Sequence, residues 1–224
     1  MLSDATDPYQ PLESKFKVTR NCLEILVKHG FPILITTKSD LVVRDLDLLK
    51  ENSVVAITIT HLDDEACRKL EPGAPPPSAR LKAVEKLSSS GVPVIVRVDP
   101  IIPGFNSDFH LLEELITRIR DAGAKQVTVS TLKLVPGLLK ALKEVAPELA
   151  KKLASMYVGG KKAAGYTYLP VSTRLLIIKR ARSIALSKGL EFASCREGLA
   201  ELNTAVCDGT GWLKKGGLET FLNV

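Results

Sequence analysis

The sequence lacks the features on which membrane and secreted proteins depend. No apolar run approaches the roughly 20 residues that a bilayer-spanning helix needs, and residues 1–4 lack the charged and apolar regions of a signal peptide. The cysteines are few and, apart from the last two, far apart, which is not the disulfide framework of a secreted domain: Cys22, Cys67, Cys195 and Cys207. We therefore expect a soluble cytoplasmic protein with reduced thiols and no membrane contact.

Aromatic residues and histidines are also scarce. Phe, Trp and Tyr make up 5% of the chain, which limits the stacking of nucleic-acid bases. The three histidines form no cluster with carboxylates, which argues against a plain metal-dependent hydrolase. The formal charge of +6 is a mild bias, because the Lys and Arg residues are dispersed among acids. A nucleic-acid partner is therefore permitted but not required.

What the sequence does contain is a regular alternation of two patterns. Four β-prone runs, at 32–37, 54–60, 93–98 and 126–130, alternate with helical patterns at 12–29, 40–50, 64–70, 78–89 and 108–122. Such alternation favours right-handed βαβ crossovers and a parallel sheet, either open or curved into a barrel. The predicted fold class is α/β, and 224 residues suit one such domain or two small ones.

The sequence pattern changes beyond Pro136. Residues 137–157 and 171–188 have helical patterns, separated by a loop with Gly and Tyr residues at 159–168. A short strand at 190–193 and a Gly-rich tail complete the chain. We therefore predict a (βα) core over residues 1–135 and a mainly helical extension over 136–224 that packs on it.

Polar residues mark the exit of the second β-prone run. This run is too apolar to have one face in water, so it is typical of a central parallel strand. Thr58 and Thr60 are two residues apart and share a face, so their hydroxyls would lie near the carboxyl end of the strand, where α/β sheets bind ligands. The alternative is that both are simply β-branched strand formers.

Five segments, in one order, carry a family resemblance over about residues 1–130. They are Ser3-Asp-Ala-Thr-Asp-Pro-Tyr-Gln-Pro-Leu-Glu13, Thr36-Thr-Lys-Ser39, Thr58-Ile-Thr60, Leu70-Glu-Pro-Gly-Ala-Pro-Pro-Pro-Ser-Ala-Arg80-Leu, and Gly91-Val-Pro-Val-Ile-Val-Arg-Val-Asp-Pro-Ile-Ile-Pro-Gly. Together they resemble the radical S-adenosylmethionine (SAM) enzymes related to spore photoproduct lyase, a group connected with DNA repair.

The resemblance implies a partial, TIM-like (βα) barrel that binds SAM at the carboxyl ends of its strands. By position, Thr6 and Asp7 would receive the amino group of the ligand, Lys38 would meet its carboxylate, and Thr60, with Thr58, would contact the carboxylate or ribose. A zwitterionic amino acid needs one acid and one base, which agrees with this set. The residues alone also allow structural explanations. Asp7 before Pro8 is a natural turn residue, and a lysine such as Lys38 is most often a solvent-exposed charge.

The chain departs from this family at the metal cluster. Radical SAM enzymes carry a CxxxCxxC loop after the first strand, whose thiolates hold three irons of a [4Fe–4S] cluster and leave the fourth for SAM. No such triplet occurs here. We predict that the first βα unit is missing through truncation or a late start, and that the chain alone does not cleave SAM.

A second departure concerns the substrate. Asp4 stands where photoproduct lyases proper carry a cysteine that donates hydrogen, and a carboxylate cannot replace a thiol in that step. The sequence therefore gives little support for repair of the thymine lesion.

Other polar residues have candidate roles of their own. Cys195 and Cys207 lie twelve apart in a Gly-containing loop and are candidate metal ligands, although a zinc or iron–sulfur site needs three or four. Arg97 and Asp99 share a face of their strand and would point into the barrel mouth or form an ion pair across it. Arg80 is predicted to form a loop-fixing ion pair, with an anion contact as the alternative.

Two hypotheses about function follow. In the first, the chain is the C-terminal portion of a radical SAM enzyme with a half-built SAM site, and the open edge is filled by a second copy or a second polypeptide. In the second, it is a non-catalytic α/β module that binds a nucleotide-like or nucleic-acid ligand through its basic faces.

Overall fold

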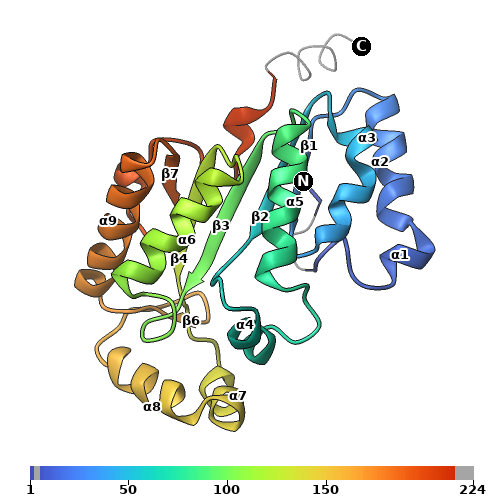
Figure 1. The fold of residues 1–224 in the computed structure, drawn as a ribbon. Helices are drawn as coiled ribbons and strands as arrows, with labels where there is room; N and C mark the ends of the chain where they lie inside the picture. The colour runs from blue at the N-terminus through green and yellow to red at the C-terminus, as the bar shows by residue number, and fades with distance from the viewer. Residues whose placement is uncertain (3–5, 215–224) are drawn as a thin grey trace.

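The protein is built on one five-stranded parallel sheet. A computed structural model describes residues 1–2 and 6–214. The strands are β1 (Ile33–Thr37), β2 (Ser53–Thr58), β3 (Val94–Ile101), β4 (Gln126–Thr131) and β7 (Glu191–Ser194), in the order β1-β2-β3-β4-β7 with every pair parallel (Figure 1). The predicted α/β class with a parallel sheet is confirmed, and the described strands form an open sheet, as a partial barrel does.

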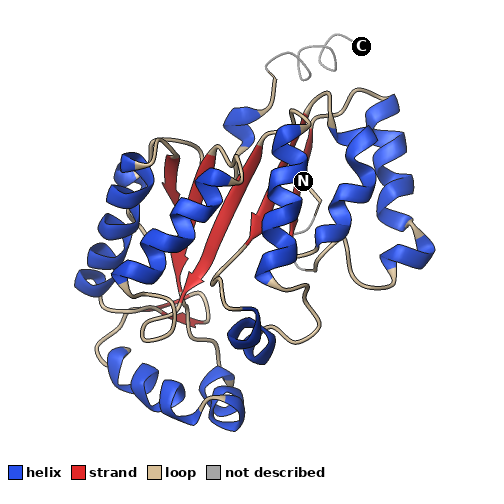
Figure 2. Cartoon of the chain, in the orientation of Figure 1, coloured by secondary structure: helices blue, strands red, loops and turns tan. Residues whose placement is uncertain are grey.

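One face of this sheet, the helix face, is covered by helices (Figures 1 and 2). Alternate strand residues, among them Ile35, Ile57, Val96, Val129 and Phe192, lie in one continuous buried apolar cluster with residues of the helices. The helices are α1 (Glu13–Phe16), α2 (Val18–Lys28), α3 (Leu46–Leu49), α4 (Asp64–Leu70), α5 (Pro77–Ser89), α6 (Phe109–Asp121), α7 (Leu138–Val145), α8 (Pro147–Met156) and α9 (Val171–Ser187). Helices α4, α7 and α8 lie beyond the carboxyl ends of the strands (Figure 1).

The other face, the inner face, carries a much smaller apolar cluster. Leu34, Val54, Ala56 and Ile95 pack there against Trp212 and Leu213 of the C-terminal tail. Gly209 brings the tail close, since a Cβ at that residue would lie 2.8 Å from the Ile95 side chain, and its φ of +84° suits glycine. The inner face is therefore covered at its amino end by residues 206–213, the covering tail.

Several predicted elements have different limits in the structure. The helix predicted at 12–29 divides into α1 and α2 at Lys17, whose backbone is left-handed. The helix predicted at 137–157 divides before Pro147, because proline disfavours a helical residue ahead of it. The helix predicted at 40–50 begins as a 3-10 helix, η1 (Asp40–Asp45). The loop at 159–168 contains an antiparallel pair, β5 (Lys162–Ala163) and β6 (Tyr166–Thr167).

The two edge strands of the sheet form hydrogen bonds with different segments of the chain. Leu2 forms an isolated parallel bridge beside β1, donating its N–H to Leu34 and accepting from Thr36. At the opposite edge, Asn203 and Thr204 hydrogen-bond the outward backbone groups of β7. Strand β7 pairs with β4 in this sheet, and α9 packs against both strands. The division at 135/136 stays a prediction.

None of the described helices could span a membrane. Among residues 1–2 and 6–214, none of the helices combines the length and apolarity needed to cross a bilayer.

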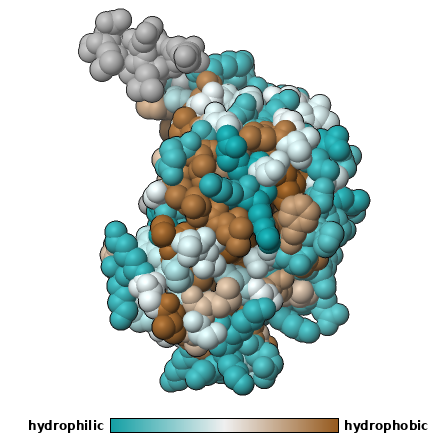
Figure 3. Space-filling view, turned by 90° about the vertical axis from the view of Figure 1, so that its left-hand side faces the viewer, coloured by the Kyte–Doolittle hydropathy of each residue, from teal (hydrophilic) through white to brown (hydrophobic). Residues whose placement is uncertain are grey.

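Figure 3 shows apolar surface in the middle of the face on the α9 and β7 side, with hydrophilic surface around it. Exposed apolar side chains of α9 include Val171 and Leu176.

Candidate functional site

A small pocket of about 170 Å³ lies beyond the carboxyl ends of β1, β2 and β3. Each of these strands ends in a polar or turn-forming sequence that leads into the pocket, which is where parallel sheets place ligands. Its described lining residues are Lys38, Thr60, Cys67, Leu70, Glu71, Pro100, Ile102 and Phe105. Two of the predicted SAM-binding residues, Lys38 and Thr60, therefore share one cavity.

Glu71 is the central charged group of this pocket. Its carboxylate lies 3.3 Å from Lys38 Nζ and 2.7 Å from an Arg80 guanidinium nitrogen, and it accepts a 3.4 Å hydrogen bond from Thr60 Oγ1. The Lys38 side chain is 39% exposed, so the ammonium group can reach a ligand in the pocket mouth. The pocket thus presents one acid and one base side by side.

Arg80 holds the Glu71 carboxylate in place from the protein interior. The Arg80 side chain is only 1% exposed and also donates to the carbonyl oxygens of Pro75 and Thr58. The predicted loop-fixing ion pair is confirmed. Because all three acceptors are protein groups, the guanidinium holds the 70–77 loop against the end of β2.

A second cavity of about 350 Å³ adjoins the first at Thr60. His61, Asn106 and Glu114 are among its lining residues. The Asn106 side-chain amide donates to the carbonyl oxygen of Thr60 at 2.7 Å and thereby fixes the backbone between the two cavities. Polar groups of Thr60 consequently face both.

Asp7 is fully engaged in holding the chain. Its Oδ1 accepts from Thr37 Oγ1 at 2.7 Å and from the Tyr9 N–H at 2.9 Å, and its Oδ2 accepts from the Lys38 N–H at 2.7 Å. These bonds tie the N-terminal segment to the end of β1 and place Lys38. Asp7 therefore positions Lys38, while its direct contact with an amino group stays a prediction. Thr6 is exposed and, among the described lining residues of the two cavities, neither Thr6 nor Asp7 appears.

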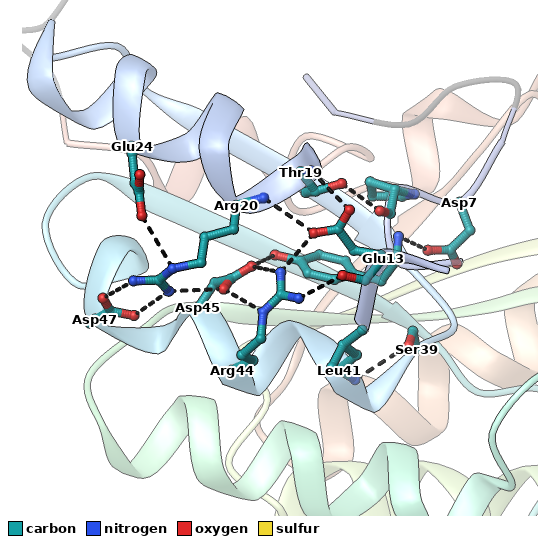
Figure 4. A network of polar contacts seen from close by, with 12 residues as sticks. Asp7, Glu13, Thr19, Arg20, Glu24, Ser39, Leu41, Arg44, Asp45 and Asp47 are labelled. Carbon is teal, nitrogen blue, oxygen red and sulfur yellow. Dashed lines mark hydrogen bonds and ion pairs between the residues drawn. The ribbon is translucent and has the colours of Figure 1, made fainter. Parts of the chain in front are cut away.

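Tyr9 and Glu13, which belong to the same motif, are buried and form a clamp on η1. Figure 4 shows Glu13 and Asp45 with their shared partner Arg44. Tyr9 donates its hydroxyl to Asp45, whose carboxylate also accepts from Arg20 and Arg44. Glu13 accepts from Arg44 and from the Thr19 N–H at the start of α2. Burial alone would raise the pKa of Asp45, but the hydrogen bonds from Arg44 and Arg20 outweigh it and lower that pKa. The clamp keeps the N-terminal segment beside Lys38.

Thr58 and the charged pair of β3 lie on the inner face rather than at the pocket. Thr58 pairs in register with Arg97, and Arg97 forms a 2.6 Å ion pair with Asp99 two residues further along the same face. Thr58 is absent from the described residues lining the two cavities. Its predicted role as a ligand contact stays a prediction.

Cys195 and Cys207 are brought together on this inner face. The side chains of Cys207 and Cys195 interact, and the Arg97 guanidinium interacts with Cys195. In the part of the chain that the structure describes, no group of three or more His, Cys, Asp or Glu side chains is placed to hold a metal ion. Their role as metal ligands stays a prediction.

Sequence reasoning missed two important carboxylates. Glu71 belongs to one of the family segments, and an acid before a Pro-Gly turn at the end of a short helix is a usable signal for a site residue. Asp45 gives little signal, because an acid in an Arg-Asp-Leu-Asp run is typical of an exposed helix. Asp4 lies outside the described residues.

The fold and the pocket define a class: an α/β partial barrel with its polar cavity at the carboxyl ends of parallel strands. The model of the Radical SAM superfamily matches residues 6–116. An uncharacterized protein of Mycobacterium tuberculosis is 31% identical over 188 residues, covering 80% of this chain and 54% of that protein. A protein of Pseudomonas phage M6 named radical SAM Nalpha-GlyT isomerase is 25% identical over 202 residues, covering 87% of this chain and 42% of its own length.

Solved structures show the same fold. A spore photoproduct lyase with bound AdoMet and dinucleoside spore photoproduct superposes with a TM-score of 0.58 at 16% identity, covering 82% of this chain and 57% of that one. A radical SAM methyltransferase from Sphaerobacter thermophilus gives a TM-score of 0.51 at 15% identity, covering 82% and 48%. The chain belongs to the radical SAM superfamily, and it spans about half the length of the curated relatives it matches.

Full-length members of this superfamily use SAM and a [4Fe–4S] cluster, so the residues must be tested against both. The four cysteines of these 224 residues do not form the CxxxCxxC spacing, and the described residues offer no three-ligand group. The residues present therefore do not fit the cluster. They fit the amino-acid part of SAM better, because Lys38 and Glu71 supply the base and the acid that a zwitterion requires.

Proposed function

We propose that this chain is the portion of a radical SAM enzyme of the photoproduct-lyase-like group that carries part of the SAM site. The observation that supports it is the pairing of Lys38 with Glu71 beside Thr60 in a cavity at the strand ends. In this arrangement Lys38 would bind the carboxylate of SAM, Glu71 would accept from its amino group, and Thr60 would hydrogen-bond the carboxylate or ribose.

The cluster-binding segment would come from outside these 224 residues. Leu2 already occupies one position beside β1, where it makes two parallel-strand hydrogen bonds, so the β1 edge is able to accept a further strand. A preceding strand with a CxxxCxxC loop would complete the barrel on this side. The chain on its own is then expected to bind SAM weakly and not to cleave it, because the iron that anchors the ligand is supplied by that loop.

A relative with a known ligand is consistent with this proposal. The similar spore photoproduct lyase structure contains AdoMet, and its fold is shared over most of this chain. The dinucleoside that it also contains suggests a nucleic-acid substrate here. The mild positive charge agrees with such a substrate, but Asp4 in place of the hydrogen-donating cysteine argues against the same repair reaction.

The test is isothermal titration of SAM into the purified chain and into Lys38→Ala. Lys69→Ala is the matched control, because Lys69 also pairs with a glutamate but its side chain is 67% exposed on α4 and does not line the pocket. We expect saturable binding that Lys38→Ala weakens by about tenfold, the loss of one charged hydrogen bond, and that Lys69→Ala leaves unchanged. Equal weakening by both variants would indicate a general charge effect and overturn the site.

A further inference from the structure

The inner face of the sheet holds a pair of thiols that the proposed SAM site does not use. Cys195 directly follows β7, and its N–H donates to the carbonyl oxygen of Val129 on β4 at 2.9 Å. Cys207 lies in the covering tail, and its carbonyl oxygen accepts from Thr128 Oγ1 at 3.0 Å. Consecutive residues of one strand therefore anchor the backbones of both cysteines, which the sequence separates by twelve positions.

The side chains of the pair meet in a polar environment. The side chains of Cys195 and Cys207 interact with each other, and the Arg97 guanidinium interacts with Cys195. Both cysteines are partly exposed, so a small reagent can reach them. The Arg97 guanidinium places a positive charge beside the sulfur of Cys195.

We propose that Cys195 and Cys207 are a redox-active thiol pair. They form a reversible intrachain disulfide by exchange with small-molecule disulfides such as oxidised glutathione. Cys195, beside Arg97, attacks one sulfur of oxidised glutathione, which forms a mixed disulfide and releases one glutathione thiolate. Cys207 then attacks the Cys195 sulfur, which forms the Cys195–Cys207 bond and releases the second glutathione. Two protein thiols lose two electrons and two protons, and one disulfide is reduced to two thiols.

The disulfide would control the tail that covers the inner face. In the reduced form the covering tail is held by single hydrogen bonds and by the contacts of Gly209. Gln126 donates to the carbonyl oxygen of Val206 and accepts from the Trp212 indole N–H, and Thr128 donates to the carbonyl oxygen of Cys207. A covalent link between Cys207 and Cys195 would tie this tail to the end of β7. Oxidation is thus expected to fasten the tail over the sheet, and reduction to leave it held by the noncovalent contacts alone.

The test uses Cys22→Ser as the background, because Cys22 is exposed and would form its own glutathione adduct. Cys67 needs no change, since it is buried and burial raises the pKa of its thiol to about 11. The protein is treated with a chelator and then with oxidised glutathione, and its peptides are mapped by mass spectrometry. We expect the loss of two thiols, a linked Cys195–Cys207 peptide and no retained glutathione.

Two further variants in this background separate the steps. Cys207→Ser is expected to keep one glutathione on Cys195, because the second attack is lost. Arg97→Gln is expected to slow formation of the mixed disulfide by about tenfold, because the positive charge beside the attacking sulfur is removed. Stable glutathione adducts on both cysteines, or unreacted thiols under conditions that oxidise free cysteine, would overturn the proposal.

Discussion

The two faces of the sheet are built from alternate residues of the same strands, yet they are covered in different ways. The helix face packs into one large apolar cluster, whereas the inner face carries a cluster of four buried apolar residues at its amino end and polar residues further along the strands. Thr58, Arg97 and Thr128 form one row of that polar part, in register across three strands. Stability is therefore concentrated on the helix face, and the inner face is left free for chemistry.

The largest loss of stability is expected from truncation on the helix face. Phe192→Ala removes a side chain that is fully buried in the large cluster and leaves a cavity behind β7. We expect the free energy of unfolding to fall by about 3–5 kcal/mol. Urea denaturation followed by circular dichroism measures this change. A loss below about 1 kcal/mol would show that the helix face does not carry the stability.

A smaller and pH-dependent loss is expected at the Asp45 clamp. Asp45→Asn weakens the hydrogen bonds from Arg20 and Arg44 and is expected to cost about 2 kcal/mol at pH 7. The folded-state pKa of Asp45 lies below its ordinary value, so its stabilising contribution is full above about pH 4 and is lost as the pH falls through the folded-state pKa. Urea denaturation at pH 7 and pH 3 should show a smaller acid-induced loss for the variant. An equal loss in both proteins would contradict this account.

The smallest loss is expected on the inner face. Gly209→Ala places a Cβ against Ile95 and Val54 at a residue with positive φ, so the covering tail must shift. We expect a cost of about 1–2 kcal/mol, limited to the tail. The fluorescence of Trp212, the single tryptophan, should report the release, while circular dichroism should report an unchanged sheet. Gly165→Ala is the matched control, because its φ is +79° but a Cβ there meets nothing within 4 Å. An equal response of Trp212 fluorescence in both variants would assign the effect to strain alone.

The sequence predicted the fold better than the site. The strands and most helices follow from apolar periodicity and Gly or Pro punctuation, and these are local signals. The short β5–β6 pair was missed because two-residue strands leave no periodic pattern. The family motifs led to Lys38 and Thr60, but the partnership of Lys38 with Glu71 depends on how two loops meet in space. The same limit applies to Asp7, whose three hydrogen bonds come from residues that only the fold brings together.

The strand order also predicts how the molecule assembles and opens. Strands β2, β3 and β4 each lie beside the strand that precedes them in the chain, so every new βα unit closes only a short loop onto an existing edge. Strand β7 reaches β4 only after α7, α8, the β5–β6 pair and α9 have intervened. Backbone amides of β7 should therefore exchange with deuterium before those of β2 and β3. Because the covering tail follows β7 in the chain, partial unfolding at this edge would expose the inner face while the pocket lined by Lys38 and Glu71 at the other side of the sheet stays formed.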